Sequence, residues 1–110
     1  MKYSLFLDDL RAVDMLYPGQ GTRFLLVRSY NAFVHCIQEN GLPSFISFDN
    51  DLGEDENGEL LPDGYACAKW LVFESGLDLS ELRFYVHSAN PVAKVQIESL
   101  LSNYLRFLNE

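Results

Sequence analysis

The stretch "SFISFDND" (residues 44–51) combines a continuous apolar run with two carboxylates at its end. Runs of this type are typical of strands in a parallel sheet that is covered on both faces, because such strands need apolar side chains on both sides. Three further stretches share the design: "YSLFLDD" (3–9), "RFLLVRS" (23–29) and "LRFYVHS" (82–88). The four runs predict the strands of one parallel sheet.

Helical patterns separate these predicted strands. Each begins at a residue that caps helices well, and each carries apolar side chains at helical spacing. The predicted helices run from Ser29 to Gly41, from Asp63 to Gly76, and from the cap Asn90 and Pro91 onward. The first connection, "LRAVDMLYPGQG" (10–21), is near the lower limit for linking parallel strands, so a loop or one or two helical turns is expected there. Alternating strands and helices predict an open parallel α/β sheet with right-handed crossovers.

Composition limits the class of protein. The 110 residues are 48% hydrophobic, which predicts a single domain over residues 1–110 with one core. Cys36 and Cys67 have no metal-ligand spacing and are interpreted as buried thiols. The first acids follow seven residues into the chain, too early for a signal sequence or membrane span, so a soluble cytoplasmic protein is expected. A net charge of -8 argues against non-specific nucleic-acid binding.

Carboxylates gather where two of the predicted strands end. Parallel α/β sheets bind ligands beyond the carboxyl ends of their strands, so Asp8, Asp9, Asp49 and Asp51 are expected to face one crevice. Grouped carboxylates need protons or a cation, and oxygen ligands suit Mg²⁺ or Mn²⁺, with Ca²⁺ also compatible. A metal site is therefore predicted. The alternative interpretation is that Asp9 and Asp51 point to solvent and merely terminate strands.

The segment "HSANP" (87–91) supplies groups for a phosphate. Asn90 begins a helix whose positive end favours anions, and Ser88 can donate a hydrogen bond. His87 is a candidate general acid or base, and the alternative is a strand-end histidine paired with a carboxylate. Arg11 is a candidate phosphate clamp, and the alternative is a simple ion pair with an acid.

The motifs together resemble those of known domains. "LFLDD", "ISFDND", "PDGYACAKWL" and "VHSA" resemble the conserved segments of response-regulator receiver domains. A fifth strand-helix unit, with the lysine that contacts the acyl phosphate, is not expected. "LDDLR", "FDNDLG", "DGYACAKW" and "HSANPV" resemble cyclic-phosphate processing receiver-like domains more closely. The resemblance implies a three-layer, flavodoxin-like fold with strand order 2-1-3-4.

The family resemblance also implies a function. It implies metal-dependent hydrolysis of a cyclic phosphate or cyclic nucleotide, with Asp49 and His87 as catalytic residues. That family has histidine at the position of Asn50, and an amide can orient a phosphate but cannot transfer protons near neutral pH. The alternative hypothesis is a non-catalytic module: a receiver phosphorylated on Asp49, or a domain that binds a nucleotide or a protein partner.

Overall fold

The computed structural model describes residues 2–110, and its centre is a parallel sheet of four short strands. The strands lie in the order β2-β1-β3-β4, as predicted. Each strand is an apolar run from one of the four stretches that the sequence singles out. The strands are β1 (Ser4–Leu7), β2 (Phe24–Val27), β3 (Phe45–Phe48) and β4 (Arg83–Val86).

The helices α1 (Tyr30–Asn40), α2 (Gly64–Phe73) and α3 (Pro91–Leu108) begin at the predicted caps. The cap side chains of Ser29 and Asp63 each accept a hydrogen bond from a backbone amide in the first helical turn. The carboxamide oxygen of Asn90 accepts two, from the amides of Val92 and Ala93, both at 3.1 Å. Each helix start is thereby fixed at the carboxyl end of the preceding strand or connection.

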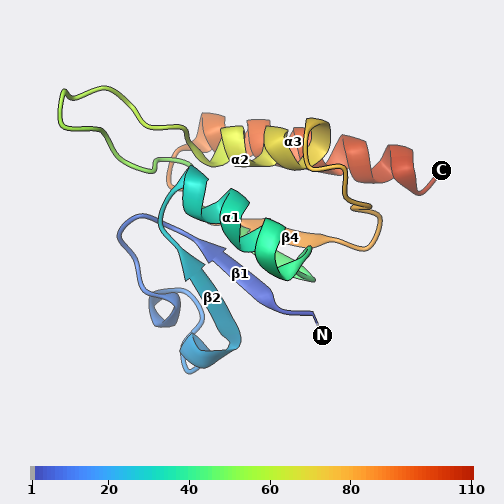
Figure 1. The fold of residues 1–110 in the computed structure, drawn as a ribbon, viewed down its shortest axis with the longest axis horizontal. Coiled ribbons are helices and arrows are strands. Elements are labelled where there is room, and N and C mark those ends of the chain that lie inside the picture. Colours follow the sequence, from blue (N-terminus) through green and yellow to red (C-terminus); the bar gives the residue numbers. More distant parts are fainter. Residues whose placement is uncertain (1) are drawn as a thin grey trace.

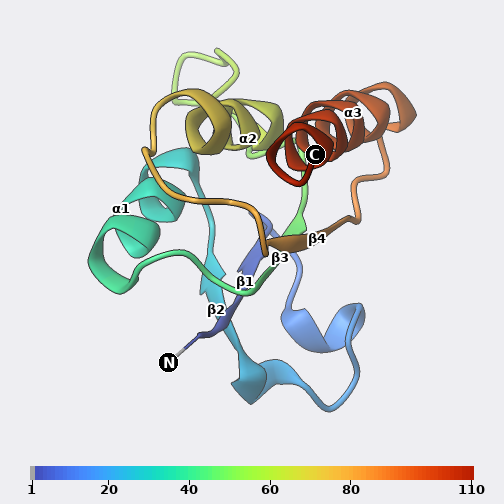
Figure 2. The same cartoon turned by 90° about the vertical axis from the view of Figure 1, so that its right-hand side faces the viewer.

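The three helices cover one face of the sheet, as Figures 1 and 2 show. Right-handed crossovers require this arrangement, because the chain moves in one direction from β2 to β4 but in the opposite direction from β1 to β2. The β1–β2 connection therefore lies on the other face. It contains two 3₁₀ helices, η1 (Val13–Met15) and η2 (Gly21–Arg23), in agreement with the expected short turns.

Alternating side chains divide the strands between two apolar layers. Leu5 and Leu7 of β1 are fully buried in the core under the helices, which contribute among others Ile37, Leu71 and Ile97. Phe6 of β1 points to the other face, where it contacts the aromatic rings of Tyr17 and Phe24. Within residues 2–110, none of the helices is long and apolar enough to cross a membrane.

Gly64 sets the distance between α2 and the end of β3. Its amide donates a 2.8 Å hydrogen bond to the carbonyl of Asn50. A Cβ atom at this position would overlap with the backbone carbonyl of Asp49. The start of α2 therefore rests directly on the backbone that carries Asp49, and a side chain at residue 64 would displace one from the other.

We expect Gly64→Ala to reduce the free energy of unfolding by about 3 kcal/mol, because rigid backbone, not a flexible side chain, must move. Chemical denaturation measures the loss. Gly19→Ala is the matched control, because a Cβ there meets open space and adds only the strain of a positive φ of 77°, which costs about 1 kcal/mol. Equal losses in the two variants would contradict the close approach.

Candidate metal centre

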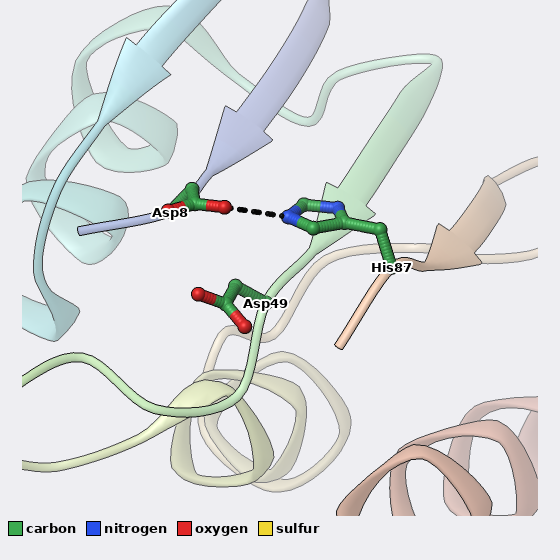
Figure 3. A group of neighbouring side chains, drawn as sticks. All are labelled: Asp8, Asp49 and His87. Atoms are coloured by element: carbon green, nitrogen blue, oxygen red, sulfur yellow. Dashed lines mark hydrogen bonds and ion pairs between the residues drawn. The ribbon is translucent and has the colours of Figure 1, made fainter. Parts of the chain in front are cut away.

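Strand register brings together three side chains from the carboxyl ends of β1, β3 and β4. Leu7 pairs with Phe48, which pairs with Val86, and the residue that follows each of them is Asp8, Asp49 or His87. The ladder continues through these residues, since the amide of Asp49 donates to the carbonyl of Leu7 at 2.9 Å and that of His87 to Phe48 at 2.8 Å. Figure 3 shows the three side chains gathered at this edge of the sheet, with Asp8 and His87 facing each other and Asp49 beside them.

Asp8 is almost completely buried, with 1% of its surface exposed. Its Oδ1 accepts hydrogen bonds from the amides of Leu10 (2.9 Å) and Arg11 (2.8 Å), and its Oδ2 lies 3.0 Å from Nε2 of His87. Burial alone would raise the pKa of Asp8, but the two amides and His87 outweigh it and hold the pKa below its usual value. Asp8 is therefore a carboxylate.

Asp49 is buried as well, but it is compensated less. The amide of Asn50 donates to its Oδ1 at 2.8 Å. Burial, together with the negative charges of Asp8 and Asp9, raises the pKa of Asp49 to about 6. Within residues 2–110, the ion pairs at this site are made by Asp8 and not by Asp49. A positive charge beside Asp49 would relieve this electrostatic cost.

The geometry fits a cation. Asp8, Asp49 and His87 each offer one ligand atom, and these atoms all lie within 4.8 Å of one another. Two buried carboxylates that lie this close suit a hard divalent ion such as Mg²⁺ or Mn²⁺. Asp9 and Asp51 do not belong to this cluster within residues 2–110, although both line the cavity above it.

His87 lies below the cavity and does not line it. Its Nε2 faces Asp8, its Nδ1 lies 2.7 Å from Oγ of Ser47, and its ring stacks on Phe6 with centroids 4.8 Å apart. Burial, more than any other effect, lowers the pKa of His87 below its ordinary value. Both ring nitrogens are thus engaged within the protein, which matches the paired strand-end histidine better than an acid exposed to substrate.

A cavity of about 460 Å³ opens above the two carboxylates. Arg11 lines it and also donates through Nη1 to the carbonyl of His87 at 3.3 Å, while its Nε lies 3.8 Å from Asp8. Ser88 and Asn90 line it too. The amides of Val92 and Ala93 are not free for an anion, because the Asn90 side chain already accepts their hydrogen bonds.

Asn50 lies between Asp49 and Asp51, which both line the cavity, but Asn50 itself does not. It is 6% exposed. Its Oδ1 accepts a 3.1 Å hydrogen bond from the amide of Tyr65 in the first turn of α2. Asn50 therefore ties α2 to the end of β3.

Two contributing residues are not evident from the sequence patterns. Ser47 is a fully buried serine within an apolar strand, and a buried hydroxyl needs a partner, which is a signal that points toward a site. Arg28 donates to the carbonyls of Asp8 (3.3 Å) and Arg11 (2.9 Å) and so holds the loop after β1. No spacing rule indicates the role of Arg28.

The acidic segment after Asp51 forms a hairpin. Glu54 and Leu60 form an antiparallel bridge, and Oδ1 of Asp55 accepts hydrogen bonds from the amides of Asn57 and Glu59. The hairpin is exposed, as expected for a solvated acidic loop. Leu60 and the adjacent Leu61 line the cavity, so the hairpin forms one of its walls.

We expect Asp49→Asn to stabilise the metal-free protein near pH 7.5. The folded-state pKa of Asp49 is raised to about 6. The protonated carboxyl group therefore stabilises the folded protein fully below the unfolded pKa near 4, and this stabilisation is lost as pH rises through about 6. The variant should gain about 1–2 kcal/mol over the wild type at pH 7.5, with allowance for solvent screening, and almost nothing at pH 4.

Urea denaturation with chelator at the two pH values measures this difference. Glu39→Gln, which removes a carboxylate from an exposed position on α1, is the control and should show no such pH dependence. If the wild type and Asp49→Asn have the same free energy of unfolding at pH 7.5, the buried carboxylate does not destabilise the protein and the prediction is wrong.

Comparison with known families identifies the family of the chain. Residues 3–103 match the family model described as the cyclic-phosphate processing receiver domain. Comparisons with curated proteins and with solved structures found no match. The family match covers β1 to β4, and it includes Asp8, Asp49 and His87. On the strength of this match, together with the four-stranded parallel sheet, the chain belongs to the cyclic-phosphate processing receiver domain family.

Proposed function

We propose that the protein binds Mg²⁺ or Mn²⁺ between Asp8 and Asp49 and, with it, hydrolyses a cyclic phosphate. Ca²⁺ is a third compatible ion. The observation that carries the proposal is a cavity of about 460 Å³ above two buried carboxylates, one of which has its pKa raised to about 6. Sites with perturbed pKa values in a cleft are functional more often than average surface positions.

Each group at the cavity has a role in this proposal. A bound divalent ion would neutralise phosphate oxygens and lower the pKa of a water molecule. Asp8 and Asp49 would hold the ion, and Asp9 and Asp51 would add negative charge beside it. The guanidinium of Arg11, whose side chain is 36% exposed, would bind a non-bridging phosphate oxygen. Ser88, which also lines the cavity, would donate a hydrogen bond to the phosphate.

Apolar groups on the cavity wall favour an organic phosphate over a bare one. Leu10 and Leu60 are each 81% exposed, and both line the cavity together with Leu61. Exposed leucines beside a polar floor suit the apolar face of a nucleobase or sugar. A small cyclic nucleotide is therefore the proposed substrate class.

His87 is assigned to positioning in this proposal and not to proton transfer. Its two ring nitrogens face Asp8 and Ser47, and the residue does not line the cavity. The proton for the leaving oxygen would come from solvent in the cavity.

The hydrogen bonds that engage His87 also favour a second candidate, a non-catalytic binding domain. With His87 engaged and Asn50 bonded to the amide of Tyr65, neither residue is available as an acid or base near neutral pH. A domain that binds a cyclic nucleotide or a protein without chemistry, or that accepts a phosphoryl group on Asp49, would not need one.

The panel that tests hydrolysis contains 2',3'- and 3',5'-cyclic nucleotides and cyclic dinucleotides, each with Mn²⁺ and the purified protein. We expect turnover of at least one compound, abolished by Asp49→Asn and by chelator, and unaffected by Glu39→Gln. Phosphate-ester products resolved by chromatography give the readout. Absence of turnover across the panel would exclude these substrates and favour the binding domain.

Two measurements identify the non-catalytic forms. Calorimetry that shows tight binding of a cyclic nucleotide without turnover would indicate a sensor. Acetyl phosphate that adds a phosphoryl mass to the wild type but not to Asp49→Asn would indicate a phosphorylated receiver.

Cation binding should depend on pH. Because the pKa of Asp49 is raised to about 6, protons compete with the ion below this value, and affinity for Mg²⁺ should fall roughly tenfold for each pH unit below it. Above pH 7 the affinity should level off. Thermal shifts on Mg²⁺ addition between pH 5 and pH 8 test this, and a shift that grows toward pH 5 would contradict the site.

A further inference from the structure

A chain of hydrogen bonds, partly buried at Tyr17 and buried from Ser47 onward, leads from the β1–β2 connection to Asp8. The hydroxyl of Tyr17 lies 2.9 Å from Oγ of Ser47, which lies 2.7 Å from Nδ1 of His87, and Nε2 of His87 lies 3.0 Å from Oδ2 of Asp8. Ser47 is fully buried and the His87 side chain is 1% exposed. The chain thus runs along the aromatic face of the sheet and reaches the cavity only at Asp8.

The groups around Asp8 fix the direction of these hydrogen bonds. Oδ1 of Asp8 accepts two backbone amides, and the guanidinium of Arg11 lies beside Oδ2, so Asp8 is surrounded by donors and is an acceptor. Nε2 of His87 must then carry the proton. In a neutral ring Nδ1 is an acceptor, so Ser47 donates to it and its Oγ accepts a hydrogen bond from the hydroxyl of Tyr17.

Aromatic packing holds the two rings of the hydrogen-bond chain, those of His87 and Tyr17, in place. The ring of His87 is nearly parallel to that of Phe6, at 7° and 4.8 Å between centroids. The ring of Tyr17 stacks on Phe24 at 5.0 Å and meets the edges of Phe6 and Phe45 at 6.3 Å each. Neither ring can turn without loss of these aromatic contacts.

We propose that Tyr17, Ser47 and His87 are positioning residues that fix the Asp8 carboxylate for a cation through one directed hydrogen-bond chain. The inference rests on the proposed cation-binding role of Asp8. In the chain, His87 is a donor to a ligand and not itself a ligand. Groups that orient metal ligands in this way commonly change affinity about 10- to 100-fold when removed.

The decisive readout is the tautomer of His87. Long-range ¹H–¹⁵N spectra of metal-free protein, recorded in the His35→Gln background so that His87 is the remaining histidine, should show a protonated Nε2 and an unprotonated Nδ1. Ser47→Ala should keep the proton on Nε2, because the groups around Asp8 set the tautomer, but should shift the Nδ1 resonance, because the hydrogen bond to Nδ1 is lost. Ser47→Thr, which keeps the hydroxyl, should restore the wild-type Nδ1 resonance. A ring protonated on Nδ1 in the wild type, alone or together with Nε2, would overturn the chain.

Mg²⁺ affinity, measured by calorimetry, gives the second readout. We expect about tenfold weaker binding in Ser47→Ala and about threefold weaker binding in Tyr17→Phe. Ser44→Ala and Tyr3→Phe are matched controls, because they remove hydroxyl hydrogen bonds at the opposite end of the same strands, and they should bind as the wild type does. Unchanged affinity in Ser47→Ala would overturn the positioning role.

The two readouts separate this inference from the proposed function. If the wild type binds no Mg²⁺, the cation site and the positioning role for it both fail, and the metal-free spectra still decide the hydrogen-bond chain. If Mg²⁺ moves the Nε2 resonance to that of a metal-bound nitrogen, His87 is a direct ligand and the positioning role is refuted.

Discussion

The forced proximity of Asp8 and Asp49 governs this structure. Parallel register between β1 and β3 places the residue after Leu7 beside the residue after Phe48, so the two carboxylates cannot separate without loss of the ladder. The protein compensates one of them thoroughly. Two amides, His87 and Arg11 surround Asp8, whereas Asp49 keeps a carboxyl group whose pKa is raised to about 6. An arrangement that compensates one of two buried acids far less than the other is easier to understand as a binding site than as a means of stabilising the fold.

The sequence could predict which residues at the strand ends form the site. Apolar runs followed by Asp8, Asp49 and His87 predict which side chains meet, because parallel strands share their carboxyl edge. The helix caps were predictable from local pattern, whereas the strand order 2-1-3-4 was implied by the family resemblance, and the structure confirms both. Strand ends and caps could be predicted because they are encoded in short segments.

Side-chain direction was less predictable, because it depends on partners that are distant in sequence. His87 turns away from the cavity because its ring bonds Ser47 and stacks on Phe6, and both of these residues belong to other strands. Asn50 looked like a cavity residue by position, yet the amide of Tyr65, which α2 brings against it, engages its oxygen. Arg28 reaches back to the loop after β1 only because β1 and β2 pair.

The two faces of the sheet contribute differently to the site. The helix-covered face supplies the hydrophobic core and, through Gly64 and Asn50, fixes the backbone around Asp49. The other face is covered by the β1–β2 connection, whose Tyr17 packs on three aromatic rings and reaches Ser47. The β1–β2 connection, which has the least regular sequence pattern, therefore reaches Asp8 through the hydrogen bonds of Tyr17, Ser47 and His87.

This division limits how the site can work. General acid–base catalysis by a positioned side chain typically contributes about 10²- to 10⁴-fold to a rate, and the two residues best suited by sequence position to supply it are both engaged in structural hydrogen bonds. The groups that remain at the cavity are carboxylates, one guanidinium, a hydroxyl and an amide. Asp49, with its pKa near 6, is the group of this set best suited to transfer protons, but in the proposed site the cation would occupy it. In the proposed hydrolysis, the rate enhancement would therefore come mainly from electrostatic stabilisation by a bound ion and Arg11, and it would depend on the charges of Asp8 and Asp49 that hold this ion.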